Sequence, residues 1–338
     1  MIIPRFWSEA QRQARLPEGE RFLVRRFGWS ATSQEDADTH ARQRLEDALA
    51  VAESGGKKAL GSFTRLERKA AYGGSDGLPI REEIVREALD GDVVLTRNSY
   101  GALCLNTPVA MFVDVDAPAS MAFGKGCVGS CLLWPVAFGL ALWWRWPSVW
   151  AALFLATAAA WVFGWLRTQV VRRQEAKDPR FTDLLEWTVD QTRTWCHERP
   201  EWRVATYETP AGVRLLPLHA TFDPASEVTD AFMSHVGADP LYARMCRLQK
   251  CFRARVTPKP WRTRFTRAYV GGGVWPVTDP VKLSRRQAWI AEYELVLPEY
   301  AACRFVRTLG LGAPDERVER IQALHDDLSN ATTRLPLA

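Results

Sequence analysis

Charged and apolar positions divide the chain into one long charge-poor segment and two flanking regions built from short periodic elements. Residues 126–166 carry a single charge, at Arg145, where Arg-Trp-Pro separates two stretches of 19 uncharged residues. At about 1.5 Å of rise per residue, each stretch would be roughly 28 Å long as a helix, close to the ~30 Å hydrocarbon core of a bilayer. The pattern therefore predicts a transmembrane helical hairpin over 126–166.

The residues around this hairpin predict how it is oriented. Tryptophans gather near its turn and near its far end, and their amphipathic rings favour the membrane interface. Lys125 precedes the segment and several Arg and Lys follow it over 167–177, whereas the turn holds Arg145 alone. By the positive-inside rule, both termini are expected in the cytoplasm. The sequence thus predicts a protein of the bacterial inner (plasma) membrane, with the lipid bilayer as its partner through two spans.

Outside this segment, the spacing of apolar residues predicts the secondary structure. Helical periodicity predicts helices over 33–54, 78–85, 181–198, 226–235, 240–249, 285–297 and 315–330. Short β-rich runs bounded by turn residues predict strands over 92–97, 102–106, 109–116, 202–208, 213–222, 251–257 and 302–308. We expect the first three strands to form an antiparallel meander and the next two to form a hairpin. Residues 21–30 are interpreted as a basic patch.

These elements predict the fold class. The strands before the hairpin and those after it are each too few to bury a face, because a stable sheet needs about three or more covered strands. We therefore expect one α+β domain, a mixed or antiparallel sheet with flanking helices, interrupted by the transmembrane hairpin. Residues 1–125 and 167–338 would be its N-terminal and C-terminal halves, and 126–166 the two-helix insertion.

Composition and charge exclude several classes of protein. The 338 residues include 15 Trp and carry a formal net charge of +5, and no compositional bias runs along the chain. A disordered tail protein and a fibrous repeat are therefore excluded. The 7 cysteines contain no C-x-x-C pair and the 5 histidines no H-E-x-x-H spacing, so neither a disulfide framework nor a zinc site is indicated.

The sharpest candidate for chemistry is the pair Asp114 and Asp116, which follows the apolar run Met111-Phe-Val. At positions i and i+2 of a strand, the two carboxylates project to the same face, about 7 Å apart along the strand. Paired acids at a strand end can hold Mg²⁺ or Mn²⁺ against phosphates, because these hard cations prefer oxygen ligands. The alternative is that both acids are structural and form an acidic turn.

A basic region lies later in the chain. Residues 244–267 contain nine Lys and Arg and no acid. Arg244 and Arg247 lie one turn apart on a predicted helix, and Arg253 and Arg255 share one face of the next predicted strand. This cluster, interleaved with aromatic residues, favours the phosphate of a nucleotide or of a nucleic-acid backbone. The alternative is a basic face held against anionic lipid.

Taken in order, these motifs resemble the catalytic core of archaeo-eukaryotic primases and primase-polymerases. That family has a D-x-D strand, an S/G-x-H motif on a later strand, and then D-x-x-V-Y-x-x-N-R-x-x-R-L with a lysine downstream. The matching positions here are Asp114 and Asp116, then Arg214 or His219, then Asp239, Arg244 and Arg247, with Lys259. The resemblance implies an α+β core, two Mg²⁺ or Mn²⁺ ions on the three aspartates, and a nucleoside triphosphate on the basic residues.

Three functions follow from these observations. The first is a membrane-anchored domain that binds nucleotide or nucleic-acid phosphate through the D-x-D site; if it is an enzyme, it is a metal-dependent nucleotidyltransferase. Its three aspartates should then converge at a cleft lined by Arg253 and Arg255. The second is a non-enzymatic inner-membrane protein whose basic surface contacts anionic lipid or a protein partner, which accounts for the basic cluster and the hairpin. The whole chain also resembles uncharacterised bacterial two-span membrane proteins, a family that supplies no activity. The third is nucleic-acid binding without catalysis.

Overall fold

A computed structural model gives the described part of the chain an α+β architecture with three β-sheets. It describes residues 1–15, 21–60, 65–69, 78–117, 178–265 and 274–338, together with 157, 161–163, 165–166 and 168–170. The chain divides into two compact units, Met1–Val115 with Gln191–Ala338, and Asp116–Asp190. The pocket described below is lined by residues of the first unit.

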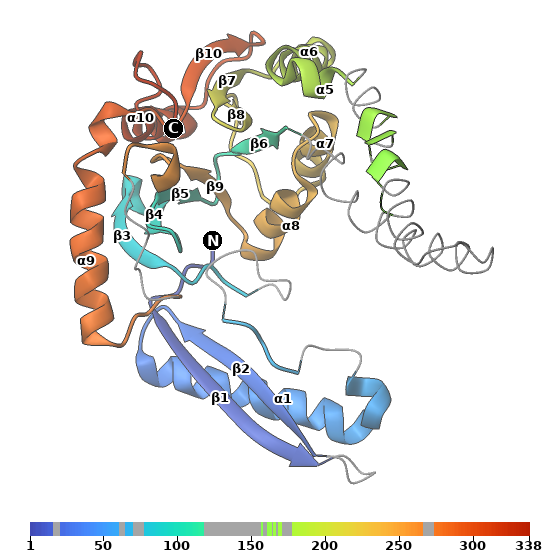
Figure 1. Cartoon of the computed structure of the whole chain (residues 1–338), viewed down its shortest axis with the longest axis vertical. Helices are drawn as coiled ribbons and strands as arrows, with labels where there is room; N and C mark the ends of the chain where they lie inside the picture. The colour runs from blue at the N-terminus through green and yellow to red at the C-terminus, as the bar shows by residue number, and fades with distance from the viewer. Residues whose placement is uncertain are drawn as a thin grey trace, which may run out of the picture. The chain divides into compact units, whose positions relative to one another are not determined.

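The N-terminal residues form a β-hairpin covered by a helix. β1 (Phe6–Arg15) and β2 (Arg21–Ser30) pair antiparallel, and α1 (Gln34–Leu60) lies along one face of them (Figure 1). Alternate residues of β2 face the helix because successive side chains of a strand point to opposite sides. The buried cluster between them consists of Phe22, Val24, Leu45, Ala48, Leu49 and Ala52.

The strand β2 corrects the interpretation of residues 21–30 as a basic patch. Its alternation is obscured in the sequence because Arg26, on the helix-facing side, is buried beside the carboxylate of Glu67, 3.8 Å from its Nε. Gly28 also faces the helix, where a Cβ atom would lie 2.2 Å from the backbone nitrogen of Ala41. Only glycine permits helix and strand to approach so closely.

The second sheet has the strand order β3-β4-β5-β9, and each neighbouring pair is antiparallel. Its strands are β3 (Glu83–Ala88), β4 (Val93–Arg97), β5 (Leu103–Thr107) and β9 (Phe252–Arg255). In the register of β5 with β9, Asn106 lies opposite Arg253 and Cys104 opposite Arg255. This pairing brings two arginines of the basic region onto a sheet whose other strands come from the first half of the chain.

The third sheet has the order β10-β7-β8-β6. Its strands are β6 (Val113–Asp116), β7 (Val204–Thr209), β8 (Gly212–Pro217) and β10 (Arg304–Leu309). The predicted hairpin is present as β7 and β8, whose register ends at Thr209 opposite Gly212. The predicted three-stranded meander is wrong, because its third strand, β6, leaves β5 and lies beside β8 instead.

Helices complete the described part of the chain. They are α5 (Pro179–Thr182), α6 (Leu184–Glu198), α7 (Glu227–His235), α8 (Pro240–Gln249), α9 (Pro280–Glu294) and α10 (Glu316–Ser329), with the short 3₁₀ helices η1 (Leu89–Gly91), η2 (Pro260–Arg262) and η3 (Leu297–Glu299). Asp239, Asp279 and Asp315 begin α8, α9 and α10, where their side chains accept bonds from backbone N–H groups of the first turn.

The main hydrophobic core joins the two four-stranded sheets to α10. Leu95 and Leu105 contribute from the second sheet, Tyr207 and Leu216 from the third, and Ile321 from α10. Each of the two sheets contains strands that precede residues 118–177 and strands that follow them. This main core is therefore built from residues of both halves of the chain.

The helix predicted over 78–85 is wrong, since β3 begins at Glu83 and residues 78–81 are not helical. The apolar residues Ile80 and Ile84 are four apart, which imitates helical spacing. The residues between them have partners far along the chain instead: Arg81 lies over the ring of Trp7, and Glu82 pairs with Arg253. Such tertiary contacts override a local periodicity.

The structure also corrects the prediction of a transmembrane hairpin. In the part of the chain that is described, no helix is long and apolar enough to cross a membrane. Most of residues 126–166 lie outside that part. A helix that spans a bilayer needs about 20 consecutive, predominantly apolar residues, and none of the described helices contains such a run. The inner-membrane localisation, the cytoplasmic termini and the membrane anchor rested on that hairpin and are corrected with it.

Candidate ligand-binding pocket

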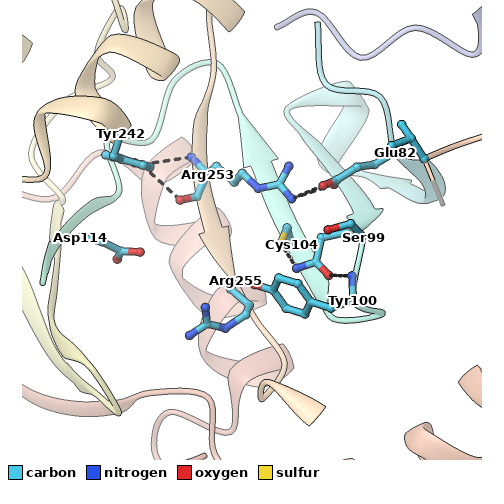
Figure 2. Close-up of a pocket in the computed structure, with 10 residues that line it drawn as sticks. Glu82, Ser99, Tyr100, Cys104, Asp114, Tyr242, Arg253 and Arg255 are labelled. Carbon is cyan, nitrogen blue, oxygen red and sulfur yellow. Dashed lines mark hydrogen bonds and ion pairs between the residues drawn. The ribbon is translucent and has the colours of Figure 1, made fainter. Parts of the chain in front are cut away.

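A pocket of about 470 Å³ is lined by residues of the second sheet, of β6 and of α8 (Figure 2). Its charged lining residues are Glu82, Asp114, Arg253 and Arg255. Its uncharged lining residues are Asn98, Ser99, Tyr100, Cys104, Tyr242 and Val274. Side chains from widely separated parts of the sequence therefore meet at one cavity, of the size typical of small-molecule sites.

One wall of the pocket is a buried ion pair. Nη2 of Arg253 donates to both carboxylate oxygens of Glu82, at 2.8 and 2.7 Å, and Nη1 donates to Oδ1 of Asn106 at 3.1 Å. The Thr96 hydroxyl also donates to Glu82, at 2.7 Å. Both charged side chains are nearly excluded from solvent, so removal of one would leave the other as a buried charge without its partner. Arg253 and Glu82 thus cancel each other's charge in the wall.

The opposite side of the pocket holds a second ion pair. Asp114, whose side chain is 33% exposed, accepts from Nε and Nη2 of Arg214 at 2.7 and 3.0 Å, a bidentate contact. Arg214 itself is 2% exposed and comes from β8, the neighbour of β6 in the sheet. Burial alone would lower the pKa of Arg214, but the charge and hydrogen bonds of Asp114 raise it above its ordinary value. Arg214 is therefore a permanent cation that Asp114 neutralises.

A buried polar cluster supports Arg214 from behind. Its Nη1 donates to the backbone oxygen of Arg255 at 2.9 Å and lies 3.2 Å from Nε2 of His325. On the other side of the ring, Nδ1 of His325 lies 2.8 Å from Oδ1 of Asp326. A neutral imidazole that donates from Nδ1 and accepts at Nε2 satisfies both contacts. The guanidinium of Arg214 is thus held in one orientation, with its charge directed at Asp114.

Tyr242 attaches α8 to the strands around the pocket. Its hydroxyl donates to the backbone oxygen of Phe112 at 2.6 Å, and it accepts from the backbone N–H of Arg253 at 3.2 Å. Asp239, which begins α8, orients the helix by accepting from the backbone N–H of Leu241 at 2.9 Å. Tyr242 therefore fixes the distance between β6, β9 and α8, on which the shape of the pocket depends.

Arg255 is the cation of the pocket whose charge is not cancelled. Among the residues that the structure describes, no carboxylate lies within 4.0 Å of its side chain, and its buried Nε makes no hydrogen bond. The backbone oxygen of Arg255 accepts a hydrogen bond from Arg214, which fixes the position of the residue. Among the charged side chains that the structure describes here, Glu82 pairs with Arg253 and Asp114 with Arg214, which leaves Arg255 without a carboxylate partner.

Tyr100 lies next to this cation. Burial raises the pKa of Tyr100, and the positive charge of Arg255 acts in the opposite direction. The backbone around it is held by Asn98, whose Oδ1 accepts from the N–H groups of Tyr100 and Ala102 at 3.2 and 3.0 Å. Asn98-Ser-Tyr-Gly, interpreted from the sequence only as a turn, thus also places an aromatic side chain in the pocket.

The pocket thiol is not a nucleophile. Cys104 is 2% exposed, and burial raises its pKa, so the sulfur stays protonated near neutral pH. A reactive cysteine needs a lowered pKa and access to solvent. The chemical capacity of the pocket therefore lies in its charged and aromatic side chains.

The structure brings together only some of the predicted site residues. Asp114, Arg253 and Arg255 line the pocket, and Arg214 contacts it through Asp114. The remaining basic candidates lie elsewhere: Arg244 and Arg247 are exposed on α8, Lys259 lies near the ring of Trp261, and His219 packs against Trp202. Arg247 forms an ion pair with Asp230 at 2.9 Å. Burial lowers the pKa of His219.

The three predicted metal ligands have different surroundings. Asp114 holds Arg214, Asp239 begins α8 and does not line the pocket, and Asp116 is exposed and belongs to the second unit. Within the described ranges, no group of three or more His, Cys, Asp and Glu is placed to hold a metal ion. Both oxygens of Asp114 already accept bonds from a buried guanidinium, so Mg²⁺ or Mn²⁺ would have to share or displace that partner. The metal site stays a prediction from the sequence.

Glu82 and Tyr100 are among the pocket residues that the sequence analysis missed. Glu82 lay within a predicted helix, and its role depends on Arg253, which is 171 residues away in the chain. Tyr100 lay in a predicted turn. An acid and an aromatic residue beside buried strands are common in any α+β protein, so no local signal could have distinguished them.

Comparison with known proteins gives no assignment: no family model, curated protein or solved structure matches this chain.

Proposed function

We propose that the pocket binds a small phosphate-bearing ligand and that Arg255 is its principal contact for the anion. The observation that carries this proposal is that, of the charged lining residues that the structure describes, Arg255 is the one without a carboxylate partner. A guanidinium is suited to this role because it donates two parallel hydrogen bonds to phosphate oxygens and stays charged at any physiological pH.

The surroundings of Arg255 favour binding of an anion over binding of a cation. The carboxylates of Glu82 and Asp114 are both occupied by arginines, so neither is available to a positively charged ligand. The volume of about 470 Å³ lies within the range of roughly 300–1,000 Å³ that small-molecule ligands occupy. The proposed function retains phosphate binding from the sequence prediction and includes no reaction step.

Calorimetric titration of the full-length chain with pyrophosphate and with inorganic phosphate tests this function. The variant Arg255→Gln removes the charge but keeps the backbone oxygen that Arg214 uses. Its affinity for pyrophosphate should fall by about 10- to 100-fold, since a hydrogen bond to a charged group contributes roughly 1.5–3 kcal/mol. The matched control is Arg285→Gln, an exposed arginine of α9 outside the pocket, which should bind like the wild type.

Two results would overturn the phosphate site. The first is a wild-type chain that binds neither anion. The second is binding that Arg255→Gln and Arg285→Gln reduce equally, because the effect would then arise from the general loss of positive charge. Raising the ionic strength should weaken binding in the wild type but should not abolish the difference between the two variants, because the pocket is less screened than the surface.

A further inference from the structure

An exposed tryptophan lies next to the pocket on a fixed piece of backbone. Trp261 is 62% exposed and is carried by the 3₁₀ helix η2. The turn is closed by Thr263, whose backbone N–H and hydroxyl both donate to the oxygen of Pro260, at 3.2 and 2.8 Å. A large apolar ring is therefore presented to solvent at a fixed position, although burying it would be favourable.

Trp261 is connected to the pocket through Tyr100. The two rings meet edge to face, with centroids 5.0 Å apart and planes 63° apart. The same tyrosine and Arg255 both line the pocket (Figure 2). Tyr100 thus has the proposed phosphate contact at one end and the exposed indole at the other, which places the anion site and an aromatic surface within the reach of one small molecule.

The charge next to Trp261 adds to this surface. Nζ of Lys259 lies 5.6 Å from the centroid of the indole ring, within the range of a cation–π contact. An indole flanked by a cation and braced by a second ring is the arrangement on which nucleic-acid bases stack, because every base has a π-face and stacking is tolerant of base identity. A sugar phosphate or an inorganic anion would leave this surface unused.

We infer that the phosphate-bearing ligand is a nucleotide, whose phosphate meets Arg255 and whose base stacks on Trp261. The inference rests on the proposed function and narrows its ligand class. It assigns a role to Tyr100 as the residue that separates the two subsites, and it requires a ligand in which a phosphate and an aromatic ring are joined by a short linker such as ribose.

Three probes separate the contributions of phosphate and base: adenosine monophosphate, ribose 5-phosphate and adenosine, each titrated calorimetrically into the full-length chain. Adenosine monophosphate should bind at least tenfold more tightly than ribose 5-phosphate, and adenosine should bind weakly. Trp261→Ala should lower the affinity for adenosine monophosphate by about tenfold or more and leave the affinity for ribose 5-phosphate unchanged. Trp261→Phe should retain most of the affinity for adenosine monophosphate. Trp161→Ala, which removes another exposed tryptophan of the second unit, is the matched control and should have no effect.

The possible failures are distinguishable. The nucleotide inference is wrong if ribose 5-phosphate binds as tightly as adenosine monophosphate, or if Trp261→Ala lowers the affinity for both ligands equally. Neither result would contradict the proposed phosphate site. If Arg255→Gln changes the affinity for none of the phosphate-bearing probes, the proposed function is wrong. Because Trp261 is exposed and its backbone bonds do not involve the side chain, thermal unfolding of Trp261→Ala should match the wild type, so a binding defect cannot be assigned to misfolding.

Discussion

Replacing either partner of the Asp114–Arg214 pair should reveal how unequally the two charges are buried. Asp114→Asn removes the counter-ion of a guanidinium that is 2% exposed, and one hydrogen-bond donor of the new amide then faces the donors of Arg214. Arg214→Met leaves a carboxylate that is 33% exposed at the pocket and can be hydrated. The two substitutions break the same contact but leave residual charges with very different access to water.

The expected costs follow from this difference. Loss of one partner of a buried pair costs about 3–5 kcal/mol, and we expect about 3 kcal/mol for Asp114→Asn because the pair borders the pocket. Arg214→Met should cost about 2 kcal/mol, chiefly because the backbone oxygen of Arg255 loses its buried donor. The double variant leaves no unpaired charge and should cost about 2 kcal/mol as well. The coupling energy between the two positions is then about 3 kcal/mol.

Urea unfolding followed by circular dichroism measures all four proteins of this double-mutant cycle. Equal slopes of free energy against urea concentration are needed for the comparison, because a changed slope indicates a changed unfolded state. The expected result is that the double variant is more stable than Asp114→Asn alone. The reasoning is refuted if the two single effects add within about 0.5 kcal/mol, as they do at independent sites.

Two further predictions concern other parts of the fold. Gly28→Ala places a Cβ atom 2.2 Å from the backbone nitrogen of Ala41 and should lower the free energy of unfolding by about 3 kcal/mol in urea titrations; a loss below about 1 kcal/mol would contradict the close approach of α1 to β2. Burial lowers the pKa of His219 below its ordinary 6.5, so the unfolded chain binds more protons below pH 6.5 and stability falls as the pH decreases through that range. His219→Asn, which keeps an acceptor for the N–H of Arg203, should reduce this pH dependence in unfolding measured at several pH values between about 5 and 8; an unchanged dependence would show that another group causes it.

Elements whose signals are local could be predicted from the sequence. The hairpin of β7 and β8 was predictable because Gly212 follows a Thr-Pro-Ala turn between two apolar runs. The helices α7, α8 and α10 begin at Ser226, Asp239 and Asp315, whose side chains accept bonds from first-turn N–H groups, and these residue types mark helix starts in any sequence. Neither signal depends on anything outside its own segment.

The rest depends on partners that lie far apart in the chain. The arginines of β9 were identified as a basic cluster, but their surroundings differ: Arg253 pairs with Glu82, whereas Arg255 has no carboxylate partner in the described part of the chain. Nothing in the spacing of the two residues distinguishes them. The same limit applies to Asp114, which matches a metal-binding motif in sequence and forms an ion pair with Arg214 in the structure. Residue type and spacing predict which groups are charged, whereas burial and pairing determine which of those charges a ligand can use.

This distinction decides how substitutions at the pocket are to be interpreted. A loss of phosphate binding in Asp114→Asn would not identify Asp114 as a ligand of metal or phosphate. The substitution leaves the charge of Arg214 without its partner beside the pocket, and it weakens the positioning of Arg214, whose guanidinium donates to the backbone oxygen of Arg255. Arg255→Gln leaves both ion pairs and their hydrogen bonds in place. The two variants therefore distinguish a residue that contacts the ligand from one that maintains the structure of the site. A substitution that abolishes binding without lowering stability identifies a ligand contact, whereas one that lowers both identifies a structural residue.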